Sequence, residues 1–446
     1  MIKKVLIANR GEIASRIIRT CKAKNIKTVA IFSEADAQAP FVKEADESYL
    51  IGPPRVNESY LQAEKIIDIA RQANVDAIHP GYGFLSENSS FVKLCEANDI
   101  IFIGPKGHVM EQMGDKIAAR NLMQRAGVPV IPGTDEAIPN PERAIEIAHD
   151  IGYPIMLKAA AGGGGIGMQI VRSDEELTTA FASNSKRAEQ FFGDGAMFAE
   201  KLLENARHIE VQIIADEHGN AVHLFERECS IQRRNQKVLE EAPSSFISEA
   251  TRKKMGETSV QAVKEIGYTN AGTIEYLVDE NEQFYFLEMN TRIQVEHAIT
   301  EEITGVDIVA LQLDVANGKQ LPLTQEDITL SGHSIEARIY AEDPVTFFPS
   351  PGIITTYKEP EGNHIRIEAS IAAGIEVTPF YDPMISKLIV SATTREKAIT
   401  LLDDALQQYE ITGIKTNISM LRKVVTEENF KRGNTTTNYI EKFYQP

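Results

Sequence analysis

The stretch of residues 284–297 constrains this chain more than any other. From Glu288 onward, every second residue can coordinate a cation, carry a charge or donate a hydrogen bond. Those residues are Glu288, Asn290, Arg292, Gln294 and Glu296. Because alternate side chains of an extended chain point to opposite faces, we expect them to form one polar wall. A solvated strand face also alternates, but Phe and Tyr leading into carboxylate, amide and guanidinium groups without a lysine favour a site.

The residues before this stretch predict a β-hairpin that brings two carboxylates together. A strand over 272–278 and a returning strand from Phe284 are separated by a short loop, which would pair Asp279 with Phe284. That register places Glu275 opposite Glu288, where two like charges are destabilising. A divalent cation removes the repulsion, and two carboxylates with an amide oxygen suit Mg²⁺ or Mn²⁺ rather than zinc. The predicted metal ligands are Glu275, Glu288 and Asn290.

Length and charge exclude several classes of protein. At 446 residues the chain should hold roughly three domains. The balance of 46 basic and 64 acidic residues gives a net charge of −18, which argues against a nucleic-acid or membrane partner. The 3 cysteines are far apart, so we expect no disulfide framework and a reducing, cytoplasmic location. The apolar start of the chain is too short for a signal peptide, and no segment has the length of a membrane span.

The order of predicted elements indicates an α/β fold in three parts. Short apolar strands alternate with amphipathic helices near the N-terminus, which predicts a doubly wound parallel sheet. The first strand lacks a GxGxxG sequence, so this part is not predicted to bind a dinucleotide. The loop 79–84 is either a tight turn or a ligand loop at the carboxyl end of a strand. We expect an N-terminal domain over 1–114, a central domain over 115–320 and a C-terminal mixed α+β domain over 331–446.

A glycine-rich loop follows a strand that ends in a lysine. The strand over 153–158 delivers Lys158 into residues 159–168, which contain five glycines. Missing side chains let backbone N–H groups approach and surround a phosphate. No Gly-Lys-Ser/Thr sequence follows and a strand returns over 169–172, so the pattern is not a P-loop. It predicts a mobile lid over a triphosphate, within about 131–203, with a surface hairpin as the alternative.

Two further charged segments hold candidate site residues. A charge run such as 227–241 is usually a solvated face, but this one joins strands of the sheet that contains Glu275. We therefore expect Lys237 to point into the site. The alternating strand over 332–340 carries Glu336 and Arg338 on one face. Taken alone, Arg338 is more often a surface ion-pair partner than a ligand.

Six segments of the chain resemble, in the same order, the biotin carboxylase family of ATP-grasp enzymes. They are residues 8–14, 79–88, 158–168, 229–237, 288–297 and 348–352. The resemblance implies a central ATP-grasp domain and a two-step reaction. ATP phosphorylates bicarbonate to carboxyphosphate, which then carboxylates the ureido nitrogen of biotin. The chain departs from the family at Ile166, where many relatives have Arg, and at Asn235, where His is common in the acetyl-CoA branch.

The resemblance also implies a role for each matching residue. The nucleotide pocket and its lid would be formed by Lys116, Lys158, Gly164, Gly165, Glu200, Lys201, Leu203, His208, Gln232 and Leu277. Bicarbonate and biotin would be bound by Lys237, Arg292, Gln294, the Val295 backbone, Arg338 and Tyr82. The catalytic residues would be Arg292, Lys237, Glu296 as the base that takes the bicarbonate proton, and Arg338 as the group that steadies the biotin enolate. The family's metal ligands match the three residues predicted from the hairpin.

The sequence also leads to an expectation about partners. It contains no Ala-Met-Lys-Met biotinylation segment and leaves no length for a carrier or carboxyltransferase domain. Biotin is therefore expected on a separate biotin carboxyl carrier protein, with carboxyltransferase subunits completing an acetyl- or propionyl-type acyl-CoA carboxylase. By resemblance, the chain is expected to form a homodimer.

Two alternative functions remain open. One is a half of a carbamoyl-phosphate-synthetase-like enzyme, which would pass phosphorylated bicarbonate to ammonia. The other is a nucleotide-binding regulatory protein that has lost the chemistry. Arg338 and Tyr82 argue against the first alternative, and Glu296, Arg292 and Lys237 argue against the second.

Overall fold

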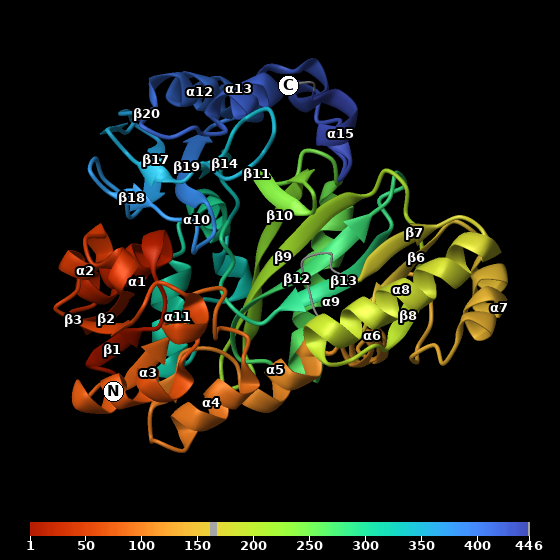
Figure 1. Cartoon of the computed structure of the whole chain (residues 1–446), viewed down its shortest axis with the longest axis horizontal. Helices are drawn as coiled ribbons and strands as arrows, with labels where there is room; N and C mark the ends of the chain where they lie inside the picture. Colours follow the sequence, from red (N-terminus) through yellow and green to blue (C-terminus); the bar gives the residue numbers. More distant parts are fainter. Residues whose placement is uncertain (161–166, 445–446) are drawn as a thin grey trace.

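Three parts of the chain meet around a central sheet (Figure 1). The computed structural model describes residues 1–160 and 167–444. In this view the N-terminal part lies at the lower left, the C-terminal part at the top and a smaller unit at the right. The predicted α/β class, with a parallel N-terminal sheet and a mixed C-terminal part, is confirmed. The predicted domain boundaries stay predictions.

The N-terminal sheet is parallel and has helices on both faces. Its strands lie in the order β3-β2-β1-β4-β5. Val5 and Ile7 of β1 pack in one hydrophobic cluster with residues of α1, whereas Leu6 packs in another with residues of α3 and α4. This doubly wound arrangement is the predicted one. The bounds are β1 (Lys4–Ile7), β2 (Lys27–Ser33), β3 (Glu47–Gly52), β4 (Ala77–His79), β5 (Ile101–Phe102), α1 (Gly11–Ala23), α2 (Pro40–Glu44), α3 (Ala63–Gln72) and α4 (Ser89–Glu96).

The central sheet continues without a break into the C-terminal part. Its eight strands lie in the order β13-β12-β9-β10-β11-β14-β19-β17, and all of its pairs are antiparallel. The charged run 227–241 does not merely join strands, because β10 and β11 pass through it. The bounds are β9 (Arg207–Ala215), β10 (Ala221–Arg233), β11 (Gln236–Ala242), β12 (Asn270–Val278), β13 (Phe284–Asn290), β14 (His333–Tyr340), β17 (Ile365–Ala369) and β19 (Met384–Ala392).

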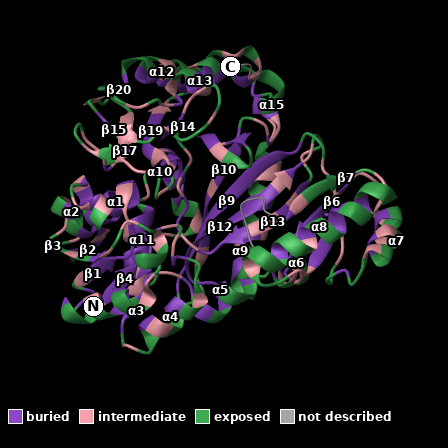
Figure 2. Cartoon of the chain, in the orientation of Figure 1, coloured by how far each residue is buried: buried purple, intermediate pink, exposed green. Residues whose placement is uncertain are grey.

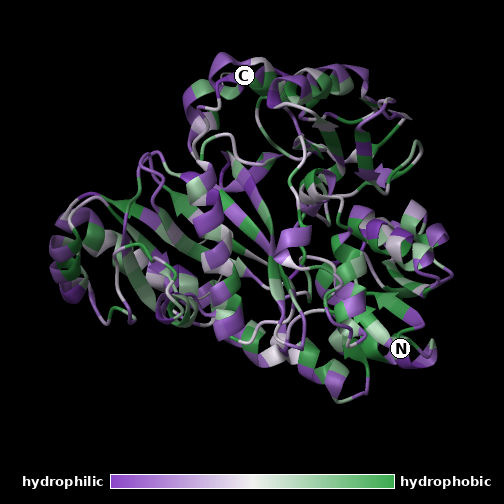
Figure 3. Cartoon of the chain, turned by 180° about the vertical axis from the view of Figure 1, so that it is seen from behind, coloured by the Kyte–Doolittle hydropathy of each residue, from purple (hydrophilic) through white to green (hydrophobic). Residues whose placement is uncertain are grey.

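The middle of this sheet is buried even though it is rich in polar residues. Figure 2 colours β9 and β12 as buried along most of their length, and every residue of β9 is buried. Seen from behind, the same strands show hydrophilic and hydrophobic colours side by side (Figure 3). Buried polar groups must be hydrogen-bonded or paired, so polar side chains gathered here indicate a functional site rather than a core.

The smaller unit, which we call the lid, contains the two paired strands that were predicted on either side of the glycine loop. β6 and β7 pair antiparallel with Lys158 opposite Met168, and β8 lies on the other edge of β6. Asn140 and Ser173 accept backbone N–H groups as caps of its two helices. The predicted lid residues Gly164 and Gly165, and Ile166, lie outside the described residues. The bounds are β6 (Ile155–Ala159), β7 (Met168–Val171), β8 (Met197–Lys201), α7 (Pro141–Ile151) and α8 (Asp174–Phe192).

Helices cover both faces of the central sheet. α9 packs on β9 and β10, and α10 packs on β10, β11, β14 and β19. In the C-terminal part, α12 packs on β14 and β19. None of the helices in the described part is long and apolar enough to cross a membrane. The remaining bounds are α5 (Gly107–Gly114), α6 (Lys116–Arg125), α9 (Glu249–Glu265), α10 (His297–Thr304), α11 (Ile308–Ala316), β15 (Gly352–Ile353), β16 (Thr356–Lys358), β18 (Glu376–Val377), α12 (Arg395–Gln408), β20 (Glu410–Thr412), α13 (Ile418–Thr426), α14 (Glu428–Lys431) and α15 (Tyr439–Phe443).

The first prediction concerns the core under α12 and α13. Leu388 of β19 is fully buried in the hydrophobic cluster that these helices form with the sheet. Leu388→Ala should lower the free energy of unfolding by about 2–5 kcal/mol, because it removes apolar contacts and leaves a cavity. Urea unfolding followed by circular dichroism measures the change. The exposed Gln407→Ala of α12 should shift the free energy by less than about 0.5 kcal/mol; equal effects of both substitutions would contradict the packing.

Candidate active site

The predicted hairpin forms and places Glu275 opposite Glu288. The register that leads there differs from the predicted one, because Val278 rather than Asp279 pairs with Phe284. The predicted Asp279–Phe284 pair is therefore wrong. The Asp279 carboxylate accepts two backbone N–H groups inside the loop, which keeps this residue out of the strand ladder. A bulge next to Glu275 takes up the extra residue and restores the opposition of the two carboxylates.

The polar wall is not one extended segment. β13 ends at Asn290, a turn follows, and α10 begins directly after Glu296. The expectation of an extended chain through Glu296 is therefore wrong. The turn brings the side chains closer than a strand would. Arg292 donates to Asn290 Oδ1 at 2.9 Å and to Gln294 Oε1 at 2.8 Å.

Lys237, which we expected to point toward Glu275, contacts three buried carboxylates. It lies in β11, and its Nζ donates to Glu210 Oε2 at 2.6 Å, Glu275 Oε1 at 3.0 Å and Glu296 Oε1 at 2.7 Å. Burial alone lowers the pKa of an ammonium group, but the three carboxylates raise the pKa of Lys237 well above its usual range. One positive charge therefore links the metal hairpin to the start of α10.

Glu296 lies between two cations that come from neighbouring strands. Its side chain is fully buried, and it accepts from Lys237 and, at 3.0 Å, from Arg338 Nη2 of β14. Burial raises the pKa of a carboxyl group, but here Lys237, Arg338 and Arg227 outweigh it and hold the pKa of Glu296 well below its usual range. Cys229 Sγ lies 3.7 Å from the same carboxylate. Glu296 is thus a buried carboxylate that stays ionised and is free to accept a proton.

Three buried residues that the sequence analysis did not single out complete this charge network. Arg227 donates to Glu210 at 2.5 Å and also to Gln212 and Thr300. Glu240 accepts from Arg338 Nε at 2.6 Å. Glu210 belongs to a segment, residues 208–214, in which polar and apolar residues alternate, and the charged and amide groups of that alternation are the signal that could have revealed it. Arg227 and Glu240 were hidden in the charged run.

The hairpin fits a hard divalent cation. Glu275 accepts from Lys237, Asn290 and Gln294, the two amides at 2.8 Å. The Glu288 carboxylate has no hydrogen-bond or ion-pair partner within the described part of the chain. Burial and the facing Glu275 raise the pKa of Glu288. An unpartnered carboxylate opposite a second one, with an amide beside them, is a donor set of the kind that Mg²⁺ takes.

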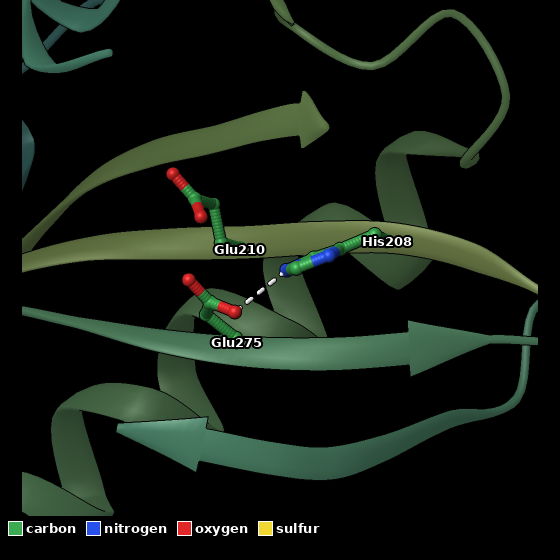
Figure 4. Close-up of side chains that lie close together, drawn as sticks. All are labelled: His208, Glu210 and Glu275. Carbon is green, nitrogen blue, oxygen red and sulfur yellow. Dashed lines mark ion pairs between the residues drawn. The ribbon is translucent and has the colours of Figure 1, made fainter. Parts of the chain in front are cut away.

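A second group of possible ligands is less suited to a metal. His208, Glu210 and Glu275 lie together on β9 and β12, and His208 Nε2 is 2.8 Å from Glu275 Oε2 (Figure 4). However, one oxygen of Glu210 accepts from Arg227 and the other from Lys237. Both oxygens of Glu210 are therefore committed to cations, whereas the Glu288 carboxylate of the hairpin has no such partner among the described residues, so the hairpin is the better metal site.

Several residues predicted to contact a nucleotide gather between the lid and the central sheet. Lys158 of the lid forms an ion pair with Glu200 of β8, and burial lowers the pKa of Lys116 at the start of α6. On the sheet, Gln232 lies 2.7 Å from His208, and Leu277 is opposite His208 in the register. The set combines two lysines, which suit phosphates, with hydrogen-bonding and apolar groups, which suit a base.

Within residues 1–160 and 167–444, two other residues predicted to contact the nucleotide, Lys201 and Leu203, form no side-chain hydrogen bond with the group just described. The Lys201 ammonium donates to the carbonyl groups of Gly152 at 2.7 Å and Tyr153 at 3.2 Å, so it is engaged within the lid. Leu203 follows β8 and is half-buried.

Tyr82 lies at the junction between the N-terminal part and the site. Its hydroxyl donates to Glu12 of α1, and burial together with Glu12 raises the pKa of Tyr82 well above its usual range. The turn around it depends on glycine, because Gly81 and Gly83 have φ values of +61° and +69°. A Cβ at Gly81 would also lie 2.9 Å from the Asn9 amide, so the loop is closely packed against the end of β1.

The family matches cover almost the whole chain in three successive parts. Residues 1–110 match the biotin carboxylase N-terminal domain, and residues 336–442 match the biotin carboxylase C-terminal domain. Residues 115–324 match the ATP-binding domain of the carbamoyl-phosphate synthase L chain.

Individual proteins are similar to this chain over nearly its full length. A biotin carboxylase of Halalkalibacterium halodurans is 62% identical over 440 residues, covering 99% of this chain and 97% of that protein. Biotin carboxylase 2 of Bacillus subtilis is 57% identical over 441 residues and 99% of both chains.

Solved structures agree with these relatives. A biotin carboxylase–β-γ-ATP complex from Campylobacter jejuni has a TM-score of 0.97 at 50% identity, with 99% of both chains covered. The biotin carboxylase domain dimer of the Hydrogenobacter thermophilus 2-oxoglutarate carboxylase, in complex with MgADP, ADP and bicarbonate, has a TM-score of 0.96 at 50% identity. That match covers 99% of this chain and 97% of the solved one. The resemblance inferred from the sequence is thereby confirmed, and the chain belongs to the biotin carboxylase family of ATP-grasp enzymes.

Proposed function

We propose that this chain catalyses the ATP-dependent carboxylation of biotin with bicarbonate, through carboxyphosphate, as the first half-reaction of a biotin-dependent carboxylase. The observation that carries the proposal is the placement of Glu296. This buried, ionised carboxylate contacts Lys237, which also binds the metal hairpin, and Arg338, which comes from the C-terminal strands. Glu296 therefore lies between Lys237, on the side where bicarbonate is phosphorylated, and Arg338, on the side where biotin reacts.

Bicarbonate binds among Arg292, Lys237, Gln294 and the Val295 backbone N–H. Arg292 offers a planar pair of donors that matches a carboxylate-like anion. Glu296 takes the bicarbonate proton, which leaves a more nucleophilic oxygen for attack on the terminal phosphate. The reaction needs alignment and charge neutralisation more than covalent help, because phosphoryl transfer has a loose transition state.

The nucleotide lies between the lid and the central sheet. Lys158 and Lys116 are the cations directed at its phosphates, and His208, Gln232 and Leu277 line the sheet side. The metal would be held by Glu275, Glu288 and Asn290. When bound, Mg²⁺ neutralises the phosphate charge and aligns the terminal phosphoryl group.

Biotin enters beside Arg338 and Tyr82. The Arg338 guanidinium cannot lose its charge and presents a planar face to a delocalised oxyanion such as the biotin enolate. Glu240 and Glu296 accept from two of its nitrogens and so fix its orientation.

The carrier and the oligomeric state follow from the relatives by analogy. This chain matches 97% and 99% of the length of the two biotin carboxylases, so those proteins extend little beyond the matching part. We therefore propose that biotin arrives on a carrier protein, that carboxyltransferase subunits complete the enzyme, and that the chain forms a dimer like the Hydrogenobacter thermophilus domain. An acyl-CoA as the final acceptor stays a prediction.

One assay separates this function from its alternatives. ADP release from ATP and bicarbonate is measured with free biotin, with ammonium and with neither. The proposed function requires stimulation by biotin. Stimulation by ammonium instead would indicate the carbamoyl-phosphate-synthetase-like reaction, and tight ATP binding without turnover in any mixture would indicate a regulatory protein.

The base role of Glu296 can be tested by Glu296→Gln. The amide keeps the size of the side chain but cannot take a proton, so biotin-dependent ADP release should fall by at least about 100-fold. Glu280→Gln, in the exposed hairpin loop, makes the same chemical change outside the site and should keep wild-type turnover. Full turnover by Glu296→Gln would remove the base assignment.

The buried Glu240 should make stability depend on pH. Burial raises its pKa from 4.5 to about 7, although Arg338 and Lys237 oppose the shift and Glu296 adds to it. The folded pKa lies above the unfolded one, so the contribution of Glu240 to stability is full below pH about 4.5 and is lost as the pH rises through about 7. The loss reaches about 3 kcal/mol.

Glu240→Gln removes this titration. Relative to the wild type, the variant should therefore gain stability between pH about 5 and pH about 8. Urea unfolding of both proteins at several pH values in that range measures the difference. A difference that does not change with pH would show that Glu240 keeps an ordinary pKa.

A further inference from the structure

Lys387 is a buried cation to which none of the steps above assigns a role. It lies in β19, its side chain has 0% exposure, and its Nζ donates to the Val295 carbonyl oxygen at 2.7 Å. The same nitrogen lies 3.2 Å from Glu12 Oε2 of α1. Lys387 therefore joins the C-terminal strands, the N-terminal part and the turn that precedes α10. Burying an ammonium group is costly unless it is paired, so the position of the Lys387 ammonium depends on these contacts.

A second buried donor acts on the neighbouring carbonyl group. His297 Nδ1 lies 2.8 Å from the Gln294 carbonyl oxygen, and because a carbonyl only accepts, Nδ1 carries the proton. Its Nε2 is buried without a hydrogen-bond partner among the described residues. Burial and the charges of Lys387 and Arg16 hold the pKa of His297 well below its usual range, so the ring stays neutral.

Together these bonds fix two successive peptide groups. A peptide group is planar, so the direction of its C=O sets the direction of its N–H. The bond from Lys387 to Val295 orients the peptide that leads into Glu296. The bond from His297 to Gln294 orients the peptide that carries the Val295 N–H. Lys387 and His297 thus hold the turn through the carbonyl groups of Val295 and Gln294. The Gln294 and Glu296 side chains remain directed at the site.

The chain of contacts continues to the biotin side. Glu12, the counter-ion of Lys387, also accepts from the Tyr82 hydroxyl. The other ionisable groups that act on Lys387 are Glu336 of β14 and Glu368 of β17. Glu12 is the acidic partner that both Lys387 and Tyr82 contact.

We propose that Lys387 is a positioning residue for bicarbonate: through the Val295 carbonyl it orients the peptide group that leads into Glu296, and with it the Glu296 carboxylate that faces this substrate. This inference rests on the proposed function. Among the described residues, Lys387 bonds to none of those assigned to the nucleotide or to the metal hairpin, so its loss should weaken the use of bicarbonate and spare the use of ATP.

The test uses a double variant that removes both buried charges together. Glu12→Gln with Lys387→Met removes both members of the Lys387–Glu12 ion pair, so neither of the two is left buried without its partner. Its KM for bicarbonate should rise by about tenfold, the scale of one lost hydrogen bond to a charged donor, while its KM for ATP stays within about twofold. Glu12→Gln alone keeps the Lys387–Val295 bond and should leave the KM for bicarbonate near the wild-type value.

A matched control separates positioning from general stability. Arg395→Met also removes a largely buried cation of the C-terminal part, one that bonds Glu241 and the carbonyl groups of Phe430 and Lys431. It should lower the melting temperature without changing the ratio of the two KM values. If the Met variant does not fold, Glu12→Gln with Lys387→Gln replaces it, because the shorter amide withdraws the donor from Val295 and keeps a polar group.

The two KM values test the role of Lys387 independently of the proposed function. Equal changes in both KM values, or a loss of stability with neither KM changed, would overturn the role of Lys387. The proposed function fails on a different observation, which is a wild-type protein that releases no ADP in response to bicarbonate and biotin.

Discussion

The structure of the site depends on the pairing of opposite charges that are out of contact with water. Glu210, Glu275 and Glu296 are all buried, and together they would repel one another. Lys237 contacts all three, and Arg227 satisfies the remaining oxygen of Glu210. Removing one partner from such a network costs more than the network contributes, because it leaves a buried charge uncompensated. The residues to which we assign the chemistry are therefore the same ones that hold the central strands together.

The continuous eight-stranded sheet explains how these charges reach one another. Lys237 lies on β11, and Arg338 lies on the adjacent strand β14. Glu296 is placed between them by the start of α10, which packs on both strands. The C-terminal strands therefore complete the site instead of forming a separate layer. This arrangement also brings Lys387 of β19 to the back of the turn before α10.

Local features of the site could be predicted from the sequence where chemistry and spacing coincide. The pairing of the two strands on either side of the glycine loop and the opposition of Glu275 and Glu288 are examples. The predicted hairpin register and the predicted extended polar wall were wrong because local interactions interrupt the strand pattern at both places. The Asp279 side chain closes the loop on itself and shifts the register, and a turn ends the polar alternation after Asn290. Alternation describes an extended chain only for as long as the chain stays extended.

By itself, the sequence determined which groups are available: hard oxygen ligands two residues apart, a lysine before a phosphate-sized loop, and the segments typical of one family. Only the tertiary structure decided which of these groups are neighbours. Arg338 and Glu240 are 98 residues apart in the chain, yet they share a hydrogen bond because β11 and β14 pair. The alternation over 208–214 fits an exposed strand equally well until strands cover both of its edges. Strand order and burial are properties of long-range pairing, and periodicity within a segment carries no information about the partner that a strand will meet.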